Sequence, residues 1–222
     1  MDRTEIAWIA PFAAALILVA LIILFFDLRS HKEASVPALS ILQSITKLTI
    51  VDELGEVAEY IKEQTAVPNV DDIISYIERG LWVEQPGYID EVEAYSGPVD
   101  EEMKPDDVRL AATGFYEVNF EPPLMANTKI QRKLSCKFIR AFTSNDEYFE
   151  IFSTKKSQRL SFELNCPERP LVGEPRLTVV DTQHTVRREQ RKFEMNASRT
   201  RLKLCIEHPV VGCKYRISWS WK

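Results

Sequence analysis

Glycine and histidine are scarce in this sequence, with seven glycines and three histidines among 222 residues. Phosphate-binding loops need closely spaced glycines, and neither G-x-G-x-x-G nor G-x-x-x-x-G-K-S/T occurs. The G-x-S-x-G and H-E-x-x-H patterns of serine hydrolases and zinc peptidases are absent too. Adjacent acids such as Asp106 and Asp107 lie in a strongly acidic stretch, which is typical of a solvated face. We therefore expect no enzyme activity and no cofactor.

Long apolar runs are also absent, with one exception at the start of the chain. Residues 6–26 contain no charged side chain. At about 1.5 Å per residue, a helix of this length is roughly 30 Å long, which matches the hydrocarbon core of a bilayer. The run is too long, and the residues before it too acidic, for a cleavable signal peptide. We expect a single transmembrane anchor within residues 1–30, which includes Ile6, Trp8, Leu16, Leu21 and Phe26.

The orientation of this anchor depends on few charges. Arg3 precedes the run, whereas Arg29 and Lys32 follow it. Lys and Arg decide orientation, and the leading positive charge is diluted by Asp2 and Glu5. We expect the N-terminus outside and the body in the cytoplasm. The lipid bilayer is then the first expected partner.

Charge is unevenly distributed over the rest of the chain. Residues 51–107 carry 17 acidic and three basic side chains, whereas residues 128–222 carry 20 basic and ten acidic ones. We expect an acidic face beside a basic face within one body. The alternative is that the basic half meets an anionic surface, either nucleic acid or lipid headgroups. The densest basic patch lacks the aromatic side chains that stack on bases, so we do not expect nucleic acid; the patch consists of Arg187, Arg188, Arg191 and Lys192.

Four cysteines, Cys136, Cys166, Cys205 and Cys213, lie at irregular spacings in or beside apolar runs. Such thiols are usually buried and remain reduced in the cytoplasm. If the body lies outside the cytoplasm, the even number permits disulfides of undetermined pairing. Cys205, His208 and Cys213 form a C-x2-H-x4-C pattern, but structural zinc sites normally show two close ligand pairs. We therefore expect no metal.

Alternation of apolar and polar residues dominates after the anchor and predicts strands. Residues 45–51 and 57–61 alternate on either side of a turn at 52–55, which is the signature of a hairpin. Residues 70–84 fit either a helix or a strand pair interrupted by Gly80, and we favour strands because the neighbouring segments are strands. Residues 108–120 read as one strand that ends at Pro122.

Further strands are expected at 88–95, 130–142, 148–152, 159–164, 177–181, 191–195, 201–206 and 214–221. These spacings suit a two-sheet sandwich or a closed barrel. The predicted fold is thus mainly β, an antiparallel β-sandwich or barrel-like body after one transmembrane helix. We divide the chain into the anchor at 1–30, a connector at 31–44 and an all-β domain at 45–222.

The last strand has the most hydrophobic face of the body. Tyr215, Ile217, Trp219 and Trp221 share one side of it. Burial of four large side chains, at roughly 1.5–3 kcal/mol each, makes this strand part of the core. An aromatic ligand box is the functional alternative.

Two stretches resemble a known bacterial module. Residues 160–170 read LSFELNCPERP, and residues 207–221 read EHPVVGCKYRISWSW. They resemble a C-terminal all-β, sandwich-like accessory module of bacterial regulatory, signalling and defence-type proteins, whose opening hairpin is similar to residues 48–58. The resemblance covers residues 45–222 and implies a binding or sensing part. It assigns no catalytic residue.

These observations favour a single-pass, membrane-anchored module that binds, senses or scaffolds an unidentified protein partner or small ligand. Tethering would raise the effective concentration of such a partner at the bilayer. The alternative is a defence-type effector whose ligand-driven oligomerisation perturbs the membrane. A single helix has no interior for a pore, so that alternative requires a homo-oligomer.

Overall fold

The computed structural model describes residues 38–79, 86–112, 115–153, 157–183, 185–189 and 191–221. Fourteen strands and no helix occur in these residues, so the mainly β prediction is confirmed. The predicted anchor, including Ile6, Trp8, Leu16, Leu21 and Phe26, lies outside them. Within the described ranges, no helix is long and apolar enough to cross a membrane.

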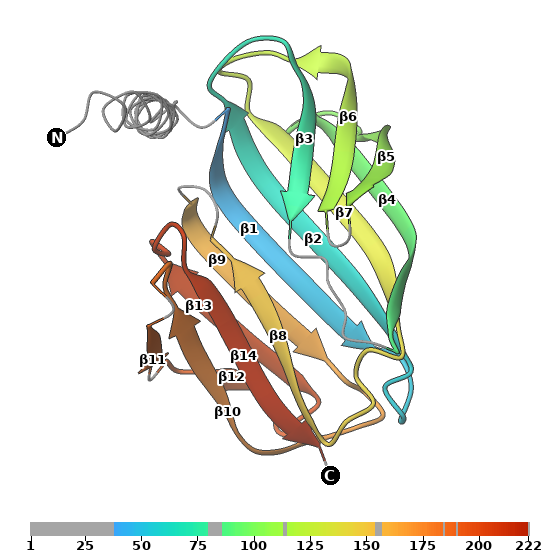
Figure 1. Ribbon diagram of the computed structural model, residues 1–222, viewed down its shortest axis with the longest axis vertical. Coiled ribbons are helices and arrows are strands. Elements are labelled where there is room, and N and C mark those ends of the chain that lie inside the picture. The colour runs from blue at the N-terminus through green and yellow to red at the C-terminus, as the bar shows by residue number, and fades with distance from the viewer. Residues whose placement is uncertain are drawn as a thin grey trace, which may run out of the picture. The chain divides into compact units, whose positions relative to one another are not determined.

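The strands form two sheets (Figure 1). The larger sheet contains, in spatial order, β12 (Glu194–Met195), β13 (Arg201–Glu207), β9 (Ser157–Asn165), β1 (Leu39–Ile50), β2 (Val57–Pro68), β7 (Ile130–Ile139), β4 (Tyr88–Pro98), β5 (Lys104–Ala112), β6 (Phe115–Leu124) and β3 (Ile73–Arg79). The smaller sheet contains β11 (Val186–Glu189), β10 (Leu171–Val180), β14 (Lys214–Trp221) and β8 (Asp146–Phe152). Neither sheet closes on itself within the described residues, so the closed alternative is wrong.

One pairing departs from the antiparallel prediction. β1 runs parallel to β9, in a register from Ile41–Ser157 to Thr49–Asn165. The other pairings of the described strands are antiparallel. The larger sheet is therefore mixed. Alternation along a strand reports which face a side chain takes and not the direction of the neighbouring strand, so it could not reveal this pair.

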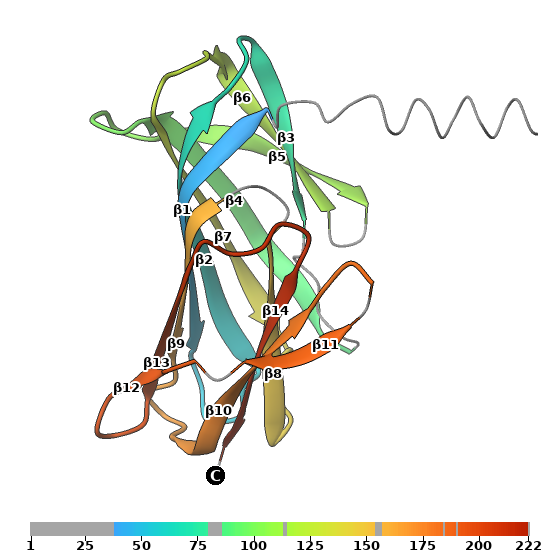
Figure 2. The same ribbon diagram turned by 90° about the vertical axis from the view of Figure 1, so that its left-hand side faces the viewer.

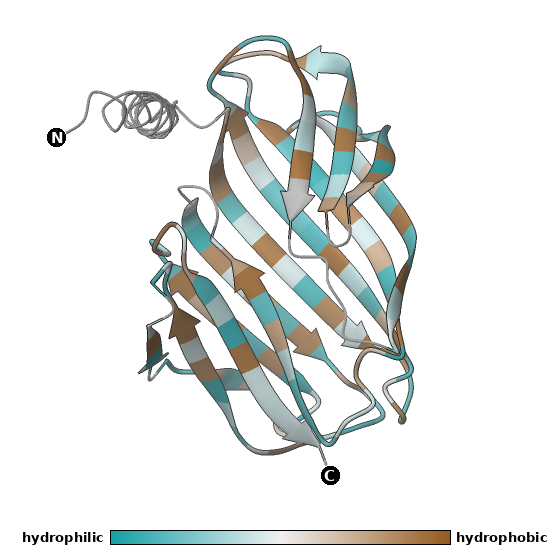
Figure 3. Cartoon of the chain, in the orientation of Figure 1, coloured by the Kyte–Doolittle hydropathy of each residue, from teal (hydrophilic) through white to brown (hydrophobic). Residues whose placement is uncertain are grey.

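Alternating side chains supply the core. In Figure 3, hydrophobic residues (brown) and hydrophilic residues (teal) form bands along the strands. On β7, buried and half-exposed residues alternate from Ile130 to Ile139. On β14, Tyr215, Trp219 and Trp221 are at most 5% exposed, and Ile217 is fully buried. The expectation that the last strand belongs to the core is therefore confirmed.

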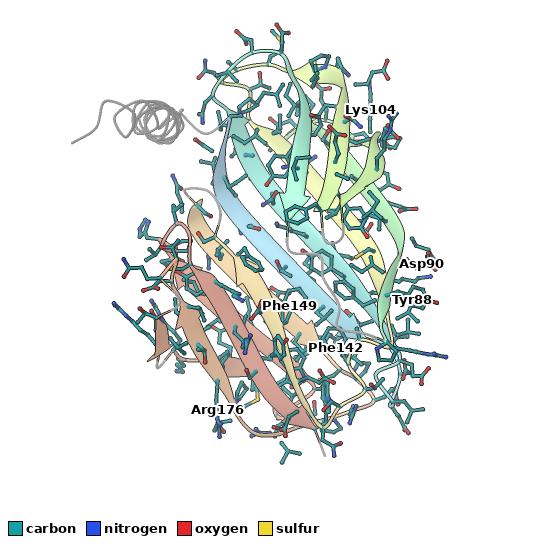
Figure 4. All side chains as sticks on the ribbon, viewed as in Figure 1. Tyr88, Asp90, Lys104, Phe142, Phe149 and Arg176 are labelled. Atoms are coloured by element: carbon teal, nitrogen blue, oxygen red, sulfur yellow. The ribbon has the colours of Figure 1, made fainter. Side chains whose placement is uncertain are left out.

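Aromatic rings join the two sheets across this core. The ring centroid of Phe149 on β8 lies 5.8 Å from that of Tyr60 on β2 and 5.6 Å from that of Phe162 on β9. Trp219 lies 6.0 Å from Phe142, centroid to centroid. Figure 4 labels Phe142 and Phe149. Each such contact contributes about 0.5–1.5 kcal/mol beyond simple burial.

The predicted hairpin at residues 45–61 is confirmed as β1 and β2, although β1 begins at Leu39, before the predicted start of the domain. The carboxylate of Asp52 closes the turn by accepting the backbone N–H groups of Leu54 and Glu56 at 2.9 and 3.1 Å and of Val57 at 2.7 Å. Partial burial alone would raise the pKa of Asp52, but these backbone donors outweigh it and lower the pKa.

The segment predicted as one strand at 108–120 is wrong in detail, because it forms a hairpin of β5 and β6. β5 pairs with β4 through Lys104–Asp106 and with β6 from Asp107 onward, so its two halves have different neighbours within the larger sheet. β6 continues past Pro122, where its pairing with β5 has already ended and a missing N–H donor costs little. The favoured strand in residues 70–84 is confirmed as β3, and residues 80–85 lie outside the description.

Residues 107–112 of β5, together with β6 and β3, form a three-stranded extension that we call the flap. Tyr76 of the flap packs on Arg132 of β7, and Phe149 of the smaller sheet packs on Tyr60 of β2. The flap and the smaller sheet therefore cover the same face of the larger sheet. Figure 2 shows both on one side of it.

Candidate functional site

A row of polar side chains crosses the face of the larger sheet beneath the flap. The register places Ser44, Gln64, Arg132 and Ser96 side by side on β1, β2, β7 and β4. We call these four residues the polar row, and each is at most 9% exposed. Gln64 Nε2 donates to Ser44 Oγ at 3.4 Å, and Arg132 Nη1 donates to Gln64 Oε1 at 3.4 Å. Buried polar groups need such partners, so the row is held together internally.

Arg132 connects this row to the flap. Its guanidinium carbon lies 4.2 Å from the ring centroid of Tyr76 on β3 and 5.4 Å from that of Phe120 on β6. A desolvated cation over an aromatic face is worth about 2 kcal/mol. A single buried cation thus contacts two of the three flap strands.

Asp106 lies where β5 changes its partner from β4 to β6. Its Oδ1 accepts a hydrogen bond from Ser96 Oγ at 2.9 Å, and its Oδ2 is buried without a hydrogen-bond partner. Burial raises the pKa of this carboxyl, while the Ser96 hydrogen bond and the charge of Arg132 offset part of the increase. Asp106 and Arg132 are therefore two interacting charged groups where the flap begins.

Two small cavities adjoin the polar row. One of about 10 Å³ is lined by residues that include Gln64, Asp106 and Arg132. The other, of about 20 Å³, includes Ser44 and the buried Ser153, whose hydroxyl has no hydrogen-bond partner. A water molecule needs about 10–15 Å³, so each cavity has room for one or two waters. This arrangement positions the flap and does not form a pocket for an organic ligand.

The flap itself presents apolar side chains to solvent. Ile74 and Leu110 are each 66% exposed, Ile77 is 38% exposed and Phe115 is 39% exposed. β3 ends the larger sheet, and within the described residues its one strand neighbour is β6. The backbone groups along the outer edge of such a strand can pair with an added strand. The outer edge of β3 is therefore the candidate functional site of the flap.

The surroundings of this edge are acidic. Asp71 and Asp72 are exposed immediately before β3, and Asp71 Oδ1 accepts the backbone N–H of Ala126 at 2.8 Å. Glu117 lies between Ile77 and Arg109 in the register, so a cation already faces it. On the outer face of the flap, Asp107 carries an ion pair to Arg109 at 2.8 Å.

The predicted basic patch is spread over an edge of the smaller sheet. Arg187 is exposed on β11, and Arg191 and Lys192 are exposed in the segment that follows. Arg191 Nε donates to Glu189 Oε2 at 2.9 Å, which neutralises part of the charge. The side chain of Arg188 lies outside the described residues.

The four cysteines are free thiols. Cys136, Cys166 and Cys213 are buried, whereas Cys205 is partly exposed. Burial raises the pKa of Cys136 to about 12 and that of Cys166 to about 11, so both are held in the protonated, unreactive form. Among the residues that the structure describes, no group of three His, Cys, Asp or Glu side chains is arranged to hold a metal ion.

The sequence did not single out the polar row, although one signal was present. Arg132 has the same parity along β7 as the buried Leu134, Cys136 and Phe138, so its position in the alternation points to the core. A cation at a buried position must find partners, and those partners mark the contact with the flap. Ser44 was placed in the connector, so its pairing with Gln64 could not be anticipated.

No family model and no curated protein matches this chain. Among solved structures, it resembles an M1 zinc metallopeptidase from Deinococcus radiodurans, with a TM-score of 0.46 and 7% identity over 82% of this chain and 42% of that one. A mutant of the Deinococcus radiodurans M1 enzyme bound to a peptide substrate gives a TM-score of 0.45 and 8% identity, with coverage of 82% and 42%. The chain thus spans about two fifths of the length of these structures.

These matches correct one prediction. We excluded enzyme activity because catalytic motifs are absent, yet the structures that the body resembles are enzymes. The prediction that the chain is not an enzyme is therefore wrong, because it was drawn from missing motifs alone. A likeness at these TM-scores transfers no activity, substrate or metal to this chain.

Proposed function

We propose that this protein is a single-pass, membrane-anchored binding module that receives an extended segment of a protein partner at the edge of its flap. The observation that supports this most directly is an edge strand, β3, with exposed Ile74 and Ile77. In strand addition, main-chain hydrogen bonds supply affinity, and alternate side chains supply specificity. The resemblance of residues 160–170 and 207–221 to an accessory module agrees with a binding role.

The chemistry of the flap defines the class of partner. Ile74 and Ile77 favour apolar side chains in the added strand, and Asp71 and Asp72 favour Lys or Arg beside it. We infer a partner segment of alternating apolar residues flanked by cations. Association with the bilayer through residues 6–26 would raise the effective concentration of a partner at the same membrane.

We place the body in the cytoplasm. The free thiols agree with a reducing compartment. Leu54 is 69% exposed in the β1–β2 turn and provides a labelling position. In intact cells, a membrane-impermeant maleimide should leave Leu54→Cys unlabelled until the cells are permeabilised. Labelling of intact cells would place the body outside.

Photo-crosslinking in native membranes tests the partner site. A photoreactive amino acid replaces Ile74 in the full chain, and the matched control replaces Val172, which is 44% exposed on β10 of the smaller sheet. We expect one discrete crosslinked protein from position 74, none from position 172, and loss of the product when Ile77→Asp is added. An identical product from both positions, or no product from position 74, contradicts the proposal.

A further inference from the structure

A second exposed apolar surface lies on the smaller sheet, away from the flap. Val186 is 65% exposed, Val210 62%, Val211 51% and Phe152 41%. We call these four residues the apolar rim. They come from β11, the loop between β13 and β14, and the end of β8. Nothing in the proposed partner site uses them.

Strand register and hydrogen bonds bring the rim together. Val186, Val180, Lys214 and Phe152 are successive cross-strand neighbours on one face of the smaller sheet. The loop with Val210 and Val211 joins the same end, because Gly212 N–H donates to Ser153 O at 2.6 Å.

The core fixes this loop as well. The backbone N–H of Val210 donates to the hydroxyl of Tyr215 at 2.8 Å, and the ring of Tyr215 is buried. At the other side of the loop, a Cβ on Gly212 would lie 2.9 Å from Thr182 Cγ2, so the loop touches the β10–β11 turn. Hydrogen bonds and packing therefore hold the loop of the rim in place.

The rim lies at the end of the body where the chain enters it. β9 begins beside the start of β1, with Ser157 paired to Ile41, and His208 N–H donates to Gln158 O at 2.8 Å. Residues 31–38 separate the predicted anchor segment at 1–30 from Leu39, and eight residues span at most about 30 Å. The β1–β2 turn lies at the opposite end of a 12-residue strand, roughly 40 Å away.

Cations accompany the apolar side chains. Arg187 follows Val186, and Lys214 Nζ lies 5.5 Å from the ring centroid of Phe152. Three acids at this end already have partners. Glu150 pairs with both Lys214 at 3.1 Å and Arg216 at 2.6 Å, which leaves one positive charge in excess. Glu207 pairs with Arg159 at 3.2 Å, and Asp181 Oδ1 accepts two backbone N–H groups. Exposed apolar groups bordered by Lys and Arg are the features that bind an anionic membrane surface.

We propose that the apolar rim docks on the headgroup region of an anionic bilayer, the membrane that holds the anchor. This inference rests on the anchored state in the proposed function. The valines enter the headgroup layer, and Arg187 and Lys214 meet lipid phosphates. Docking fixes the body against the membrane and holds the β1–β2 turn away from it.

Lipid quenching in reconstituted vesicles tests this docking. The full chain, with Cys205→Ser to remove the partly exposed thiol, carries an environment-sensitive fluorophore on Val211→Cys or, as the control, on Leu54→Cys. The vesicles contain phosphatidylcholine with or without phosphatidylserine and a headgroup-nitroxide lipid. We expect several-fold stronger quenching at position 211 than at 54, an increase with phosphatidylserine and a decrease at high salt.

Two further measurements separate the possible failures. If an alkaline carbonate wash releases the chain from the vesicles, the anchored state itself is wrong. If the chain is retained but quenching is equal at positions 211 and 54, docking of the rim is wrong. Val210→Asp should abolish the difference, whereas Val51→Asp, at a residue 45% exposed near the opposite end, should preserve it. Far-UV circular dichroism checks that both variants fold.

Discussion

At the scale of single residues, Gly55 determines how the β1–β2 turn meets the rest of the body. Its φ is +71°, a conformation that strains any residue with a side chain. A Cβ at this position would lie 1.9 Å from the backbone oxygen of Phe142. The close approach lets Phe142 N–H donate to Gly55 O at 3.2 Å, which secures the turn against the segment after β7. Position 55 thus requires a residue that tolerates a positive φ and that has no Cβ.

We predict that Gly55→Ala lowers the free energy of unfolding by about 2–4 kcal/mol, because strain and a backbone clash add together. Urea unfolding of the full chain in detergent, followed by intrinsic fluorescence, measures the change. Gly173→Ala is the matched control, since its φ is +68° and nothing lies within 4 Å of the added Cβ. It should cost about 1 kcal/mol. Equal losses would mean that the Phe142 contact has no effect.

At the scale of elements, the flap depends on buried charge. Asp106 sits at the bend of β5, and Arg132 contacts both β3 and β6 through their aromatic rings. Burial raises the pKa of Asp106, so the folded chain holds the proton more strongly than the unfolded chain does. Its contribution to stability therefore decreases as pH rises from the ordinary value of 3.8 through the raised value.

We predict that Asp106→Asn removes this dependence. Between about pH 4 and about pH 7, the free energy of unfolding of the wild type should fall relative to that of the variant. Urea titrations at both pH values give the difference. Asp107→Asn, at a neighbouring carboxylate that is 54% exposed, should track the wild type. A constant difference between wild type and Asp106→Asn would contradict the prediction.

The elements also show how far sequence patterns reach. The β1–β2 hairpin, β7 and β14 were predicted because each alternates regularly and buries one face, whereas β3 was favoured because its neighbouring segments are strands. The β5–β6 hairpin was missed, since its turn falls inside an apparently continuous run at 108–120. The flap could not be predicted because it depends on which strands become neighbours, and Arg132 was not recognised as buried because cations usually lie outside. Register, not composition, brings the polar row together.

At the scale of the whole molecule, the smaller sheet depends on its last strand. β14 lies between β10 and β8, and its four large apolar side chains are each at most 5% exposed. We predict that deletion of residues 213–222 unfolds the body, because the lost burial, at roughly 1.5–3 kcal/mol per side chain, approaches a typical total stability of about 5–15 kcal/mol. Rapid proteolysis and loss of the near-UV dichroism signal would report it.

Deletion of Lys222 alone is the matched control, because it leaves Trp221 and its hydrogen bond from Nε1 to Ser144 O at 2.8 Å. This variant should retain protease resistance. If the longer deletion also remained resistant, β14 would be dispensable, and the two layers would be held by the remaining aromatic contacts.

The charge asymmetry of the chain is also a property of the whole molecule. Lys137 of β7, in the basic half, lies 2.6 Å from Glu91 of β4, in the acidic half. Because β4 lies beside β7, the two halves meet within one sheet. Exposed ion pairs of this kind each contribute less than about 1 kcal/mol to the free energy of unfolding. They therefore favour the observed pairing of β4 with β7 more than they stabilise the fold.

The parallel pairing of β1 with β9 has a consequence during protein synthesis. β1 leaves the ribosome early, but Ser157, the partner of Ile41, emerges only after roughly 115 more residues. At about 5–20 residues per second, the first strand waits on the order of ten seconds for its second neighbour. During that delay, a nascent hairpin with one open side is exposed to misassembly. Chaperone demand should therefore peak before β9 is translated and fall once it has docked.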